Sequence, residues 1–301
     1  MCDEEKLARW AKEGLSGRYN RREFAMLAGV ATVAACAPAS DVEANDETDA
    51  QVTLPAMREE NISFATADGT MDAFWVVPQT NPAPAVLFWP DIAGIRDAKR
   101  DMARRLAGNG YAVLVVNPYY RDVVGEQFAD FSAFRSDGGF RKVGPWRKKL
   151  TAEAIMRDAV SAVAWLDAQP EVDTARGIGT QGYCMGGPFT FWSAAAVPDR
   201  VKGVASFHGG GLVRDDNPMS PHLTFDDTQA GYLVAISQDD DAKAPDHKAI
   251  LREAAAAAGR PAEIGVYAGD HGWTVPDFPI YAEAAAERAW SNLLELYGAH
   301  L

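Results

Sequence analysis

Short apolar runs alternate with longer amphipathic stretches from about residue 60 to the end of the chain. Continuous apolar runs at residues 85–89 and 111–116 are typical of strands buried on both faces of a parallel sheet. Residues 151–168 carry apolar side chains at helical spacing, which predicts an amphipathic helix. Further strands are predicted at residues 61–65, 71–77, 176–181, 201–207, 232–236 and 263–267, and further helices at residues 97–109, 245–258 and 278–296. This alternation predicts an α/β protein, with a mostly parallel central sheet flanked by helices in one domain.

Residues 121–150 interrupt the alternation between a predicted strand and the long predicted helix. The segment is aromatic and glycine-bearing, and its basic residues are Arg135, Arg141, Lys142, Arg147, Lys148 and Lys149. Long loops in compact domains are usually functional or disordered. Two interpretations stay open: a solvated surface excursion, or a cap over the site whose positive charge attracts a carboxylate substrate.

The N-terminal part of the chain is predicted to direct export. Arg21 and Arg22 precede an apolar run from Phe24 to Ala35, and this pattern resembles a bacterial twin-arginine signal. Residues 33–36 resemble a lipoprotein cleavage box that would leave Cys36 lipidated, whereas residues 37–39 offer an ordinary cleavage site. We therefore predict a signal over residues 1–39, an acidic linker over 40–58 and a catalytic domain over 59–301, with a periplasmic location. A lipidated Cys36 would be the one route to membrane association.

Composition narrows the range of partners. The chain has 42 acidic and 29 basic residues and a net charge of −13, so it lacks the basic character that nucleic-acid binding requires. Of its three cysteines, Cys2 and Cys36 lie in the predicted signal. The mature protein would keep Cys184 alone, and a lone thiol in an exported protein is a liability unless it is buried or useful.

Residues 182–187 read Gly-Tyr-Cys-Met-Gly-Gly and match the pattern Gly-x-nucleophile-x-Gly. In α/β-hydrolases this pattern forms a nucleophile elbow, a tight turn between a strand and a helix. The small residues have a physical role, since the nucleophile has strained backbone angles and bulky neighbours would collide with the strand and the helix. The motif predicts an α/β-hydrolase fold in which Cys184 is the nucleophile.

A catalytic thiol needs a base, and the fold supplies its partners in the chain order nucleophile, acid, histidine. His271 follows the predicted last strand, and it is the best placed of the histidines beyond Cys184. The acid should follow the strand at 232–236, where three consecutive aspartates, Asp239 to Asp241, leave the register open. The spacing Asp-x-x-x-Pro favours Asp241, with Asp240 as the alternative.

The oxyanion hole of this fold uses two main-chain N–H groups. One belongs to the residue after the nucleophile, which is Met185, and the other to the loop after an early central strand. That loop is predicted over residues 89–96, and Ile92 is the expected donor.

With these motifs the chain resembles the dienelactone hydrolase family over about residues 60–300. The resemblance rests on residues 182–187 and 270–273, on the acid loop that ends at Pro245, and on the segments 91–94 and 117–121. It implies a Cys-His-Asp triad that hydrolyses an enol-lactone to an open-chain keto acid, with no metal or other cofactor. Family members also carry a glutamate in the early loop that handles the proton of the thiol, and Asp91 is its shorter counterpart here. Arg121 matches a contact to the carboxylate of the substrate.

The sequence predicts a hydrolase of an ester or lactone bond in a small, anionic substrate. Two alternatives stay open, a general carboxylesterase on the same fold and a non-catalytic binding protein, since a fold alone does not fix a function. The triad residues are all present, which favours an enzyme over a binding protein.

Overall fold

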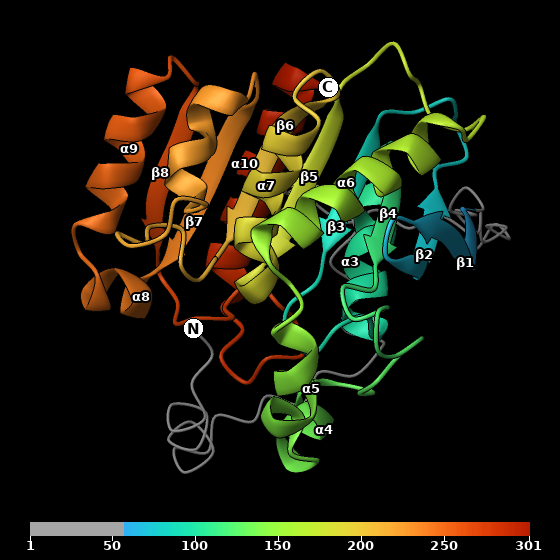
Figure 1. Cartoon of the computed structure of the whole chain (residues 1–301), viewed down its shortest axis with the longest axis horizontal. Coiled ribbons are helices and arrows are strands. Elements are labelled where there is room, and N and C mark those ends of the chain that lie inside the picture. The colour runs from blue at the N-terminus through green and yellow to red at the C-terminus, as the bar shows by residue number, and fades with distance from the viewer. Residues whose placement is uncertain (1–56) are drawn as a thin grey trace, which may run out of the picture.

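An eight-stranded sheet runs through the centre of the computed structural model, which describes residues 57–301 (Figure 1). The strand order is β1-β2-β4-β3-β5-β6-β7-β8. The strands are β1 (Arg58–Thr66), β2 (Gly69–Val77), β3 (Ala85–Trp89), β4 (Ala112–Val116), β5 (Ile178–Tyr183), β6 (Val201–Phe207), β7 (Gly231–Ser237) and β8 (Ala262–Tyr267). Strands β1 and β2 form an antiparallel hairpin, β2 pairs antiparallel with β4, and the pairs from β4 to β8 are parallel.

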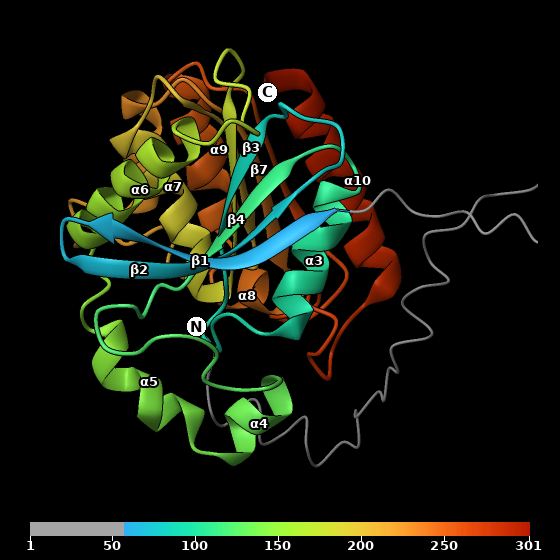
Figure 2. The same cartoon turned by 90° about the vertical axis from the view of Figure 1, so that its right-hand side faces the viewer.

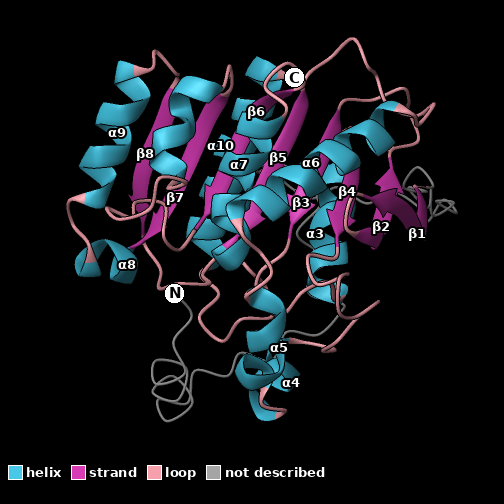
Figure 3. Cartoon of the chain, viewed as in Figure 1, coloured by secondary structure: helices cyan, strands magenta, loops and turns pink. Residues whose placement is uncertain are grey.

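Helices cover both faces of this sheet (Figure 2). Figure 3 shows α6, α7 and α9 in front of the sheet, with α3 and α10 behind it. The helices are α3 (Asp97–Ala107), α4 (Phe131–Ser136), α5 (Gly139–Arg147), α6 (Ala152–Asp167), α7 (Gly187–Ala196), α8 (Gln238–Lys243), α9 (His247–Ala257) and α10 (Glu283–His300), with 3-10 turns η1 (Cys184–Gly186) and η2 (Pro221–Asp227). The predicted fold class is confirmed. No helix in residues 57–301 is long and apolar enough to cross a bilayer.

Burial explains the sequence pattern. All five residues of β3 and all five of β4 are buried, because helices lie on both faces of these central strands. The edge strand β1 is mostly exposed, with Phe64 as its one buried side chain. The continuous apolar runs therefore mark the middle of the sheet and the alternating run marks its edge, as expected for a parallel sheet with an antiparallel hairpin.

Strand order brings distant segments to one edge of the sheet. β3 pairs with β5 in parallel, with Trp89 opposite Gly182, so the loop after β3 and the turn after β5 emerge side by side. β6, β7 and β8 follow in order, so the segments after these strands meet at the same edge. Ligands of open α/β sheets bind at the carboxyl ends of strands where the order of connection reverses. Here it reverses between β3 and β5, because β4 lies on the other side of β3.

Residues 121–150 are not a plain loop. They contain α4 and α5, which extend beyond the edge of the sheet in both views (Figures 1 and 2). The Asp130 carboxylate accepts a hydrogen bond from the Ala133 N–H and caps α4. Phe131 and Phe134 are fully buried, and Phe131 stacks on Phe278 at 3.6 Å between ring centroids. The helices were missed because their apolar contacts are with each other and with Phe278, which lies far along the chain. We call residues 131–150 the cap.

The C-terminal helix was predicted to begin at residue 278, but α10 begins at Glu283, because residues 268–282 form the loop that carries His271. The predicted export signal at 1–39, with Cys36, lies outside the described residues. So does most of the predicted linker at 40–58.

Candidate active site

The elbow after β5 holds Cys184 in a left-handed backbone conformation, with φ of 53°. Its glycines allow the close contacts of the turn. A Cβ on Gly182 would lie 2.0 Å from the Gly186 carbonyl oxygen, and one on Gly186 would lie 2.6 Å from the Trp89 carbonyl oxygen. A non-glycine residue with positive φ is uncommon and such strain concentrates at functional sites. Cys184 is 4% exposed and, as the one cysteine among residues 57–301, forms no disulfide there.

His271 lies beside this sulfur and is buried, at 1% exposure. Its Nδ1 contacts an Asp240 carboxylate oxygen, which leaves Nε2 for Cys184. Burial would lower the pKa of His271, but the negative charges and hydrogen bonds of Cys184 and Asp240 outweigh it and raise the pKa to about 9. A His271 that faces a Cys184 thiolate is therefore an imidazolium at neutral pH.

Asp240, and not Asp241, is the carboxylate against His271. The favoured expectation of Asp241 is corrected, because its oxygens lie 2.7 and 3.0 Å from Lys248 Nζ on α9. The Ser237 hydroxyl donates to Asp240 Oδ2 at 2.7 Å. Burial would raise the pKa of Asp240, but the contacts with His271 and Ser237 hold it well below its usual range. Asp239 Oδ1 accepts the main-chain N–H of His271 at 2.8 Å. Two of the three aspartates thus orient His271.

The expected oxyanion donors, Ile92 and Met185, flank the same site. Both are buried, at 1% and 9% exposure. The Tyr119 hydroxyl donates to the Ile92 carbonyl oxygen at 2.8 Å and lies 3.3 Å from Met185 Sδ. No hydrogen-bond acceptor within residues 57–301 takes the Ile92 N–H. That N–H is therefore available to an oxyanion.

Comparison with known proteins now decides the family. The model of the dienelactone hydrolase family matches residues 71–301. The chain belongs to the dienelactone hydrolase family. Two curated relatives bear the name "Putative carboxymethylenebutenolidase". The one from Salmonella typhi is 28% identical over 241 residues, which cover 78% of this chain and 85% of the relative. The one from Methylorubrum extorquens is also 28% identical, with 78% and 79% covered.

Solved structures agree on the fold. A crystal structure titled "Putative Dienelactone Hydrolase", from Klebsiella pneumoniae, has a TM-score of 0.68 at 24% identity, with 81% of this chain and 99% of that chain covered. The predicted family is confirmed, and membership makes the chain a hydrolase of the carboxylic ester class.

The contacts of Asp91 do not fit the role that the resemblance implied for it. Its carboxylate is fully buried and contacts Arg96 through both oxygens at 2.9 Å and Lys99 Nζ at 2.8 Å. Burial would raise the pKa of Asp91, but these two cations hold it well below its usual range. A carboxylate so neutralised is a poor acceptor for the thiol proton. The expectation that Asp91 handles this proton therefore loses its physical basis.

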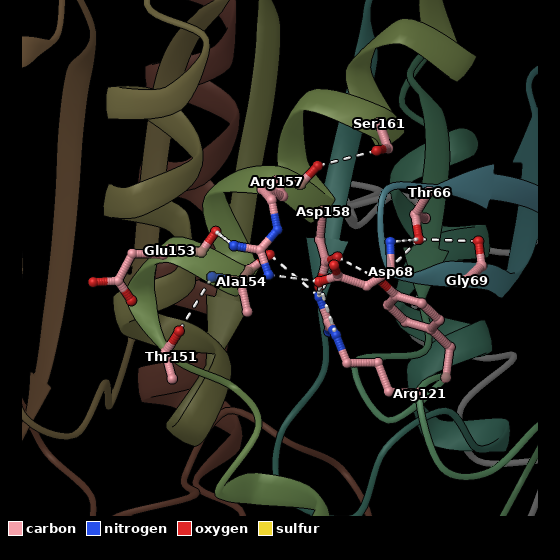
Figure 4. A network of polar contacts seen from close by, with 11 residues as sticks. Thr66, Asp68, Gly69, Arg121, Thr151, Glu153, Ala154, Arg157, Asp158 and Ser161 are labelled. Carbon is pink, nitrogen blue, oxygen red and sulfur yellow. Dashed lines mark hydrogen bonds and ion pairs between the residues drawn. The ribbon is translucent and has the colours of Figure 1, made fainter.

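Arg121 is also engaged elsewhere. Its guanidinium binds Asp158 on α6 at 2.7 and 2.9 Å and Asp68, in the β1–β2 turn, at 2.6 Å (Figure 4). The Tyr120 hydroxyl donates to Asp158 in the same network. Since two carboxylates neutralise Arg121, it is not free to bind the carboxylate of a substrate, and that expectation is corrected.

His208 is a neighbour of the site that the sequence did not single out as functional. It follows β6, has a left-handed φ of 40° and packs edge-on against His271 at 5.0 Å between ring centroids. Its Nε2 lies 2.9 Å from the Thr274 hydroxyl, in the loop that carries His271. Burial lowers the pKa of His208 well below its ordinary value, and His271 adds to this shift. His208 thus packs as a neutral ring against the imidazolium.

Proposed function

We propose that this protein hydrolyses an ester or lactone bond of a small substrate through a covalent acyl-enzyme on Cys184. The observation that carries the proposal is the arrangement of Cys184, His271 and Asp240 at the elbow. A thiolate paired with an imidazolium is an activated nucleophile. The relatives' names support an ester or lactone as the substrate.

In the acylation step the Cys184 thiolate attacks the carbonyl carbon, and the developing oxyanion accepts hydrogen bonds from the Ile92 and Met185 N–H groups. The C–O bond then breaks, and the departing oxygen takes the proton from His271 Nε2. In a lactone the departing oxygen stays attached to the acyl group, so the product is an open-chain acid.

Deacylation uses the same residues in reverse. His271, now neutral, takes a proton from water as the water attacks the thioester carbonyl, and collapse of the intermediate expels the Cys184 thiolate. His271 is again an imidazolium, and Asp240 stabilises it throughout through Nδ1. No step needs a metal or an organic cofactor.

We further propose that the substrate is anionic and that the cap attracts it. Residues 131–150 contain six Lys and Arg against one Asp, in a chain of net charge −13. Arg141, Lys142 and Lys148 are exposed. This field, in place of Arg121, would raise the local concentration of a carboxylate substrate. It would weaken as ionic strength rises.

The test of function is a panel of enol-lactones and p-nitrophenyl esters, assayed with the parent protein and with Cys184→Ala. We expect hydrolysis to be lost in the variant while its circular dichroism is unchanged. Preference for anionic lactones, with KM rising with salt, supports the full proposal, and equal rates on neutral esters point to a general carboxylesterase. Retained hydrolysis in Cys184→Ala overturns the mechanism, and no turnover by the parent protein favours a binding protein.

We also propose that the enzyme acts in the periplasm, on the strength of Arg21, Arg22 and the apolar run that follows them. Cell fractionation should find the mature protein outside the cytoplasm. Replacement of both arginines by lysine should retain it inside. Mass spectrometry of the exported protein would show whether Cys36 is lipidated. A full-length cytoplasmic product from the parent gene overturns the proposal.

A further inference from the structure

The peptide unit between Asp91 and Ile92 has a fixed direction. Its carbonyl oxygen accepts a hydrogen bond from the Gly94 N–H at 3.0 Å. In a trans peptide the C=O and N–H bonds point in opposite directions. The Ile92 N–H therefore points away from the turn that residues 91–94 form. Whatever holds this turn in place also aims the proposed oxyanion donor.

Tyr119 holds one side of the turn. Its hydroxyl, at the carboxyl end of β4, donates to the Ile92 carbonyl oxygen at 2.8 Å, and it lies 3.3 Å from Met185 Sδ. The side chain is 2% exposed and its main-chain N–H is fixed by Asn117 Oδ1 at 2.9 Å. One buried hydroxyl thus contacts both residues that supply the proposed oxyanion donors.

Arg96 holds the other side. All five N–H groups of its guanidinium have acceptors: both oxygens of Asp91, both oxygens of Asp277, and the Gly94 carbonyl oxygen. The Asp277 contacts are 2.6 and 2.8 Å long, and the Arg96 side chain is completely buried. Bidentate arginine–carboxylate pairs fix geometry as well as charge. Arg96 pairs in this way with Asp91, inside the turn, and with Asp277, outside it, and so holds the turn in place.

Asp277 connects the turn to two other parts of the site. It lies in the loop after β8, six residues beyond His271, and its Oδ2 also accepts the main-chain N–H of Phe131 at 2.9 Å. The oxyanion loop, the histidine loop and the cap thus meet at one half-buried carboxylate. Asp277 lies 181 residues from Arg96 along the chain.

We infer that Tyr119 and the Arg96–Asp277 pair are positioning residues that aim the Ile92 N–H at the oxyanion. The inference rests on the proposed function and adds residues that the triad does not include. Oxyanion donors are effective only when preorganised, and a misplacement of about 1 Å can cost about 100-fold in rate. None of the three side chains needs to touch the substrate.

The experiment compares two reactions of the same sulfur. Alkylation of Cys184 by iodoacetamide needs the thiolate but develops no oxyanion, whereas ester hydrolysis needs both. We expect Tyr119→Phe and Asp277→Asn to lower kcat by about 10- to 100-fold with KM within about 3-fold. The rate of alkylation and its pH profile should stay those of the parent.

Arg105→Gln is the matched control. Arg105 lies on α3 and forms a bidentate pair with Glu287 on α10, at 2.6 and 2.7 Å, but it contacts neither the oxyanion loop nor the histidine loop among the contacts of the described residues. We expect both reactions to be unchanged. Arg96 is completely buried and joins the buried Asp91 to Asp277, so its removal endangers folding. Tyr119→Phe, which loses one hydroxyl, is therefore the decisive variant. Thermal unfolding should show that it folds.

The outcomes separate the two proposals. Unchanged hydrolysis in both Tyr119→Phe and Asp277→Asn overturns the positioning role, and so does a parallel loss of hydrolysis and alkylation, which indicates general disruption. If Cys184→Ala still hydrolyses the substrate, the proposed function fails instead, whatever the other variants do. Loss of hydrolysis with intact alkylation supports both.

Discussion

Asp240 and Asp91 are both carboxylates at the carboxyl edge of the same sheet, the first half-buried and the second fully buried, and the pKa of each is well below its usual range. The difference lies in their partners. Asp240 faces an imidazole that gains and loses a proton, whereas Asp91 faces an arginine, whose charge is permanent, and a buried lysine. The same shift in pKa therefore indicates proton chemistry in one loop and a fixed ion cluster in the other. A perturbed pKa marks a candidate, and its partners decide the role.

Asp240→Asn should have the largest effect on activity. Loss of the charge leaves His271 without the carboxylate that orients it and stabilises the imidazolium, so we expect kcat to fall by about 10³- to 10⁴-fold. Steady-state kinetics on the best substrate of the panel would measure it. A decrease of less than about 10-fold would remove Asp240 from the triad.

Asp91→Asn tests the other side of the comparison. It leaves the buried Lys99 without its carboxylate partner, so we expect the free energy of unfolding to drop by about 3–5 kcal/mol. Urea denaturation would measure this. The pH profile of kcat should keep its shape, although kcat itself falls because Arg96 loses one of its two carboxylates. A shift of the low-pH side of this kcat profile would instead show that Asp91 carries a proton in the reaction.

The pKa of His271 gives a direct reading of its partners. It is raised to about 9 by Cys184 and Asp240 against the effect of burial, so the imidazolium persists through neutral pH and is lost as the pH rises through about 9. We expect Cys184→Ala and Asp240→Asn each to lower this pKa, as followed by NMR of the ring. If the pKa of His271 is unchanged in Cys184→Ala, the Cys184 sulfur carries no negative charge in the parent protein.

Asp241→Asn should have the smallest effect. It removes a partly exposed pair with Lys248, which is worth about 1 kcal/mol or less. We expect kcat within about 3-fold of the parent, and the contrast with Asp240→Asn makes this variant its control. Equal losses in the two variants would contradict the assignment of Asp240.

The acid was misassigned for a local reason. The three aspartates were expected in a loop, but they lie in the first turn of α8, where successive side chains point about 100° apart. A shift of one residue therefore changes the partner completely. Asp240 points to His271 while Asp241 points to Lys248 on α9. The spacing to Pro245 contains no information on this direction.

Arg96, Asp277 and Tyr119 were not predicted as site residues. Their partners lie far away along the chain, and no periodic pattern relates them. The segment 117–121 was noted for its resemblance to the family, and that was the one available signal for Tyr119. The basic residue noted in it, Arg121, proved to be bound to Asp68 and Asp158 instead.

The sequence by itself determined the strands, the order of the nucleophile, acid and histidine segments, and the elbow at Cys184. These depend on local periodicity and on glycines within a few residues of each other, so a linear pattern contains them. Only the tertiary structure decided which carboxylates stay available for chemistry. That depends on which cations are buried beside them, and Arg96 and Asp277, 181 residues apart, meet only once the sheet has formed.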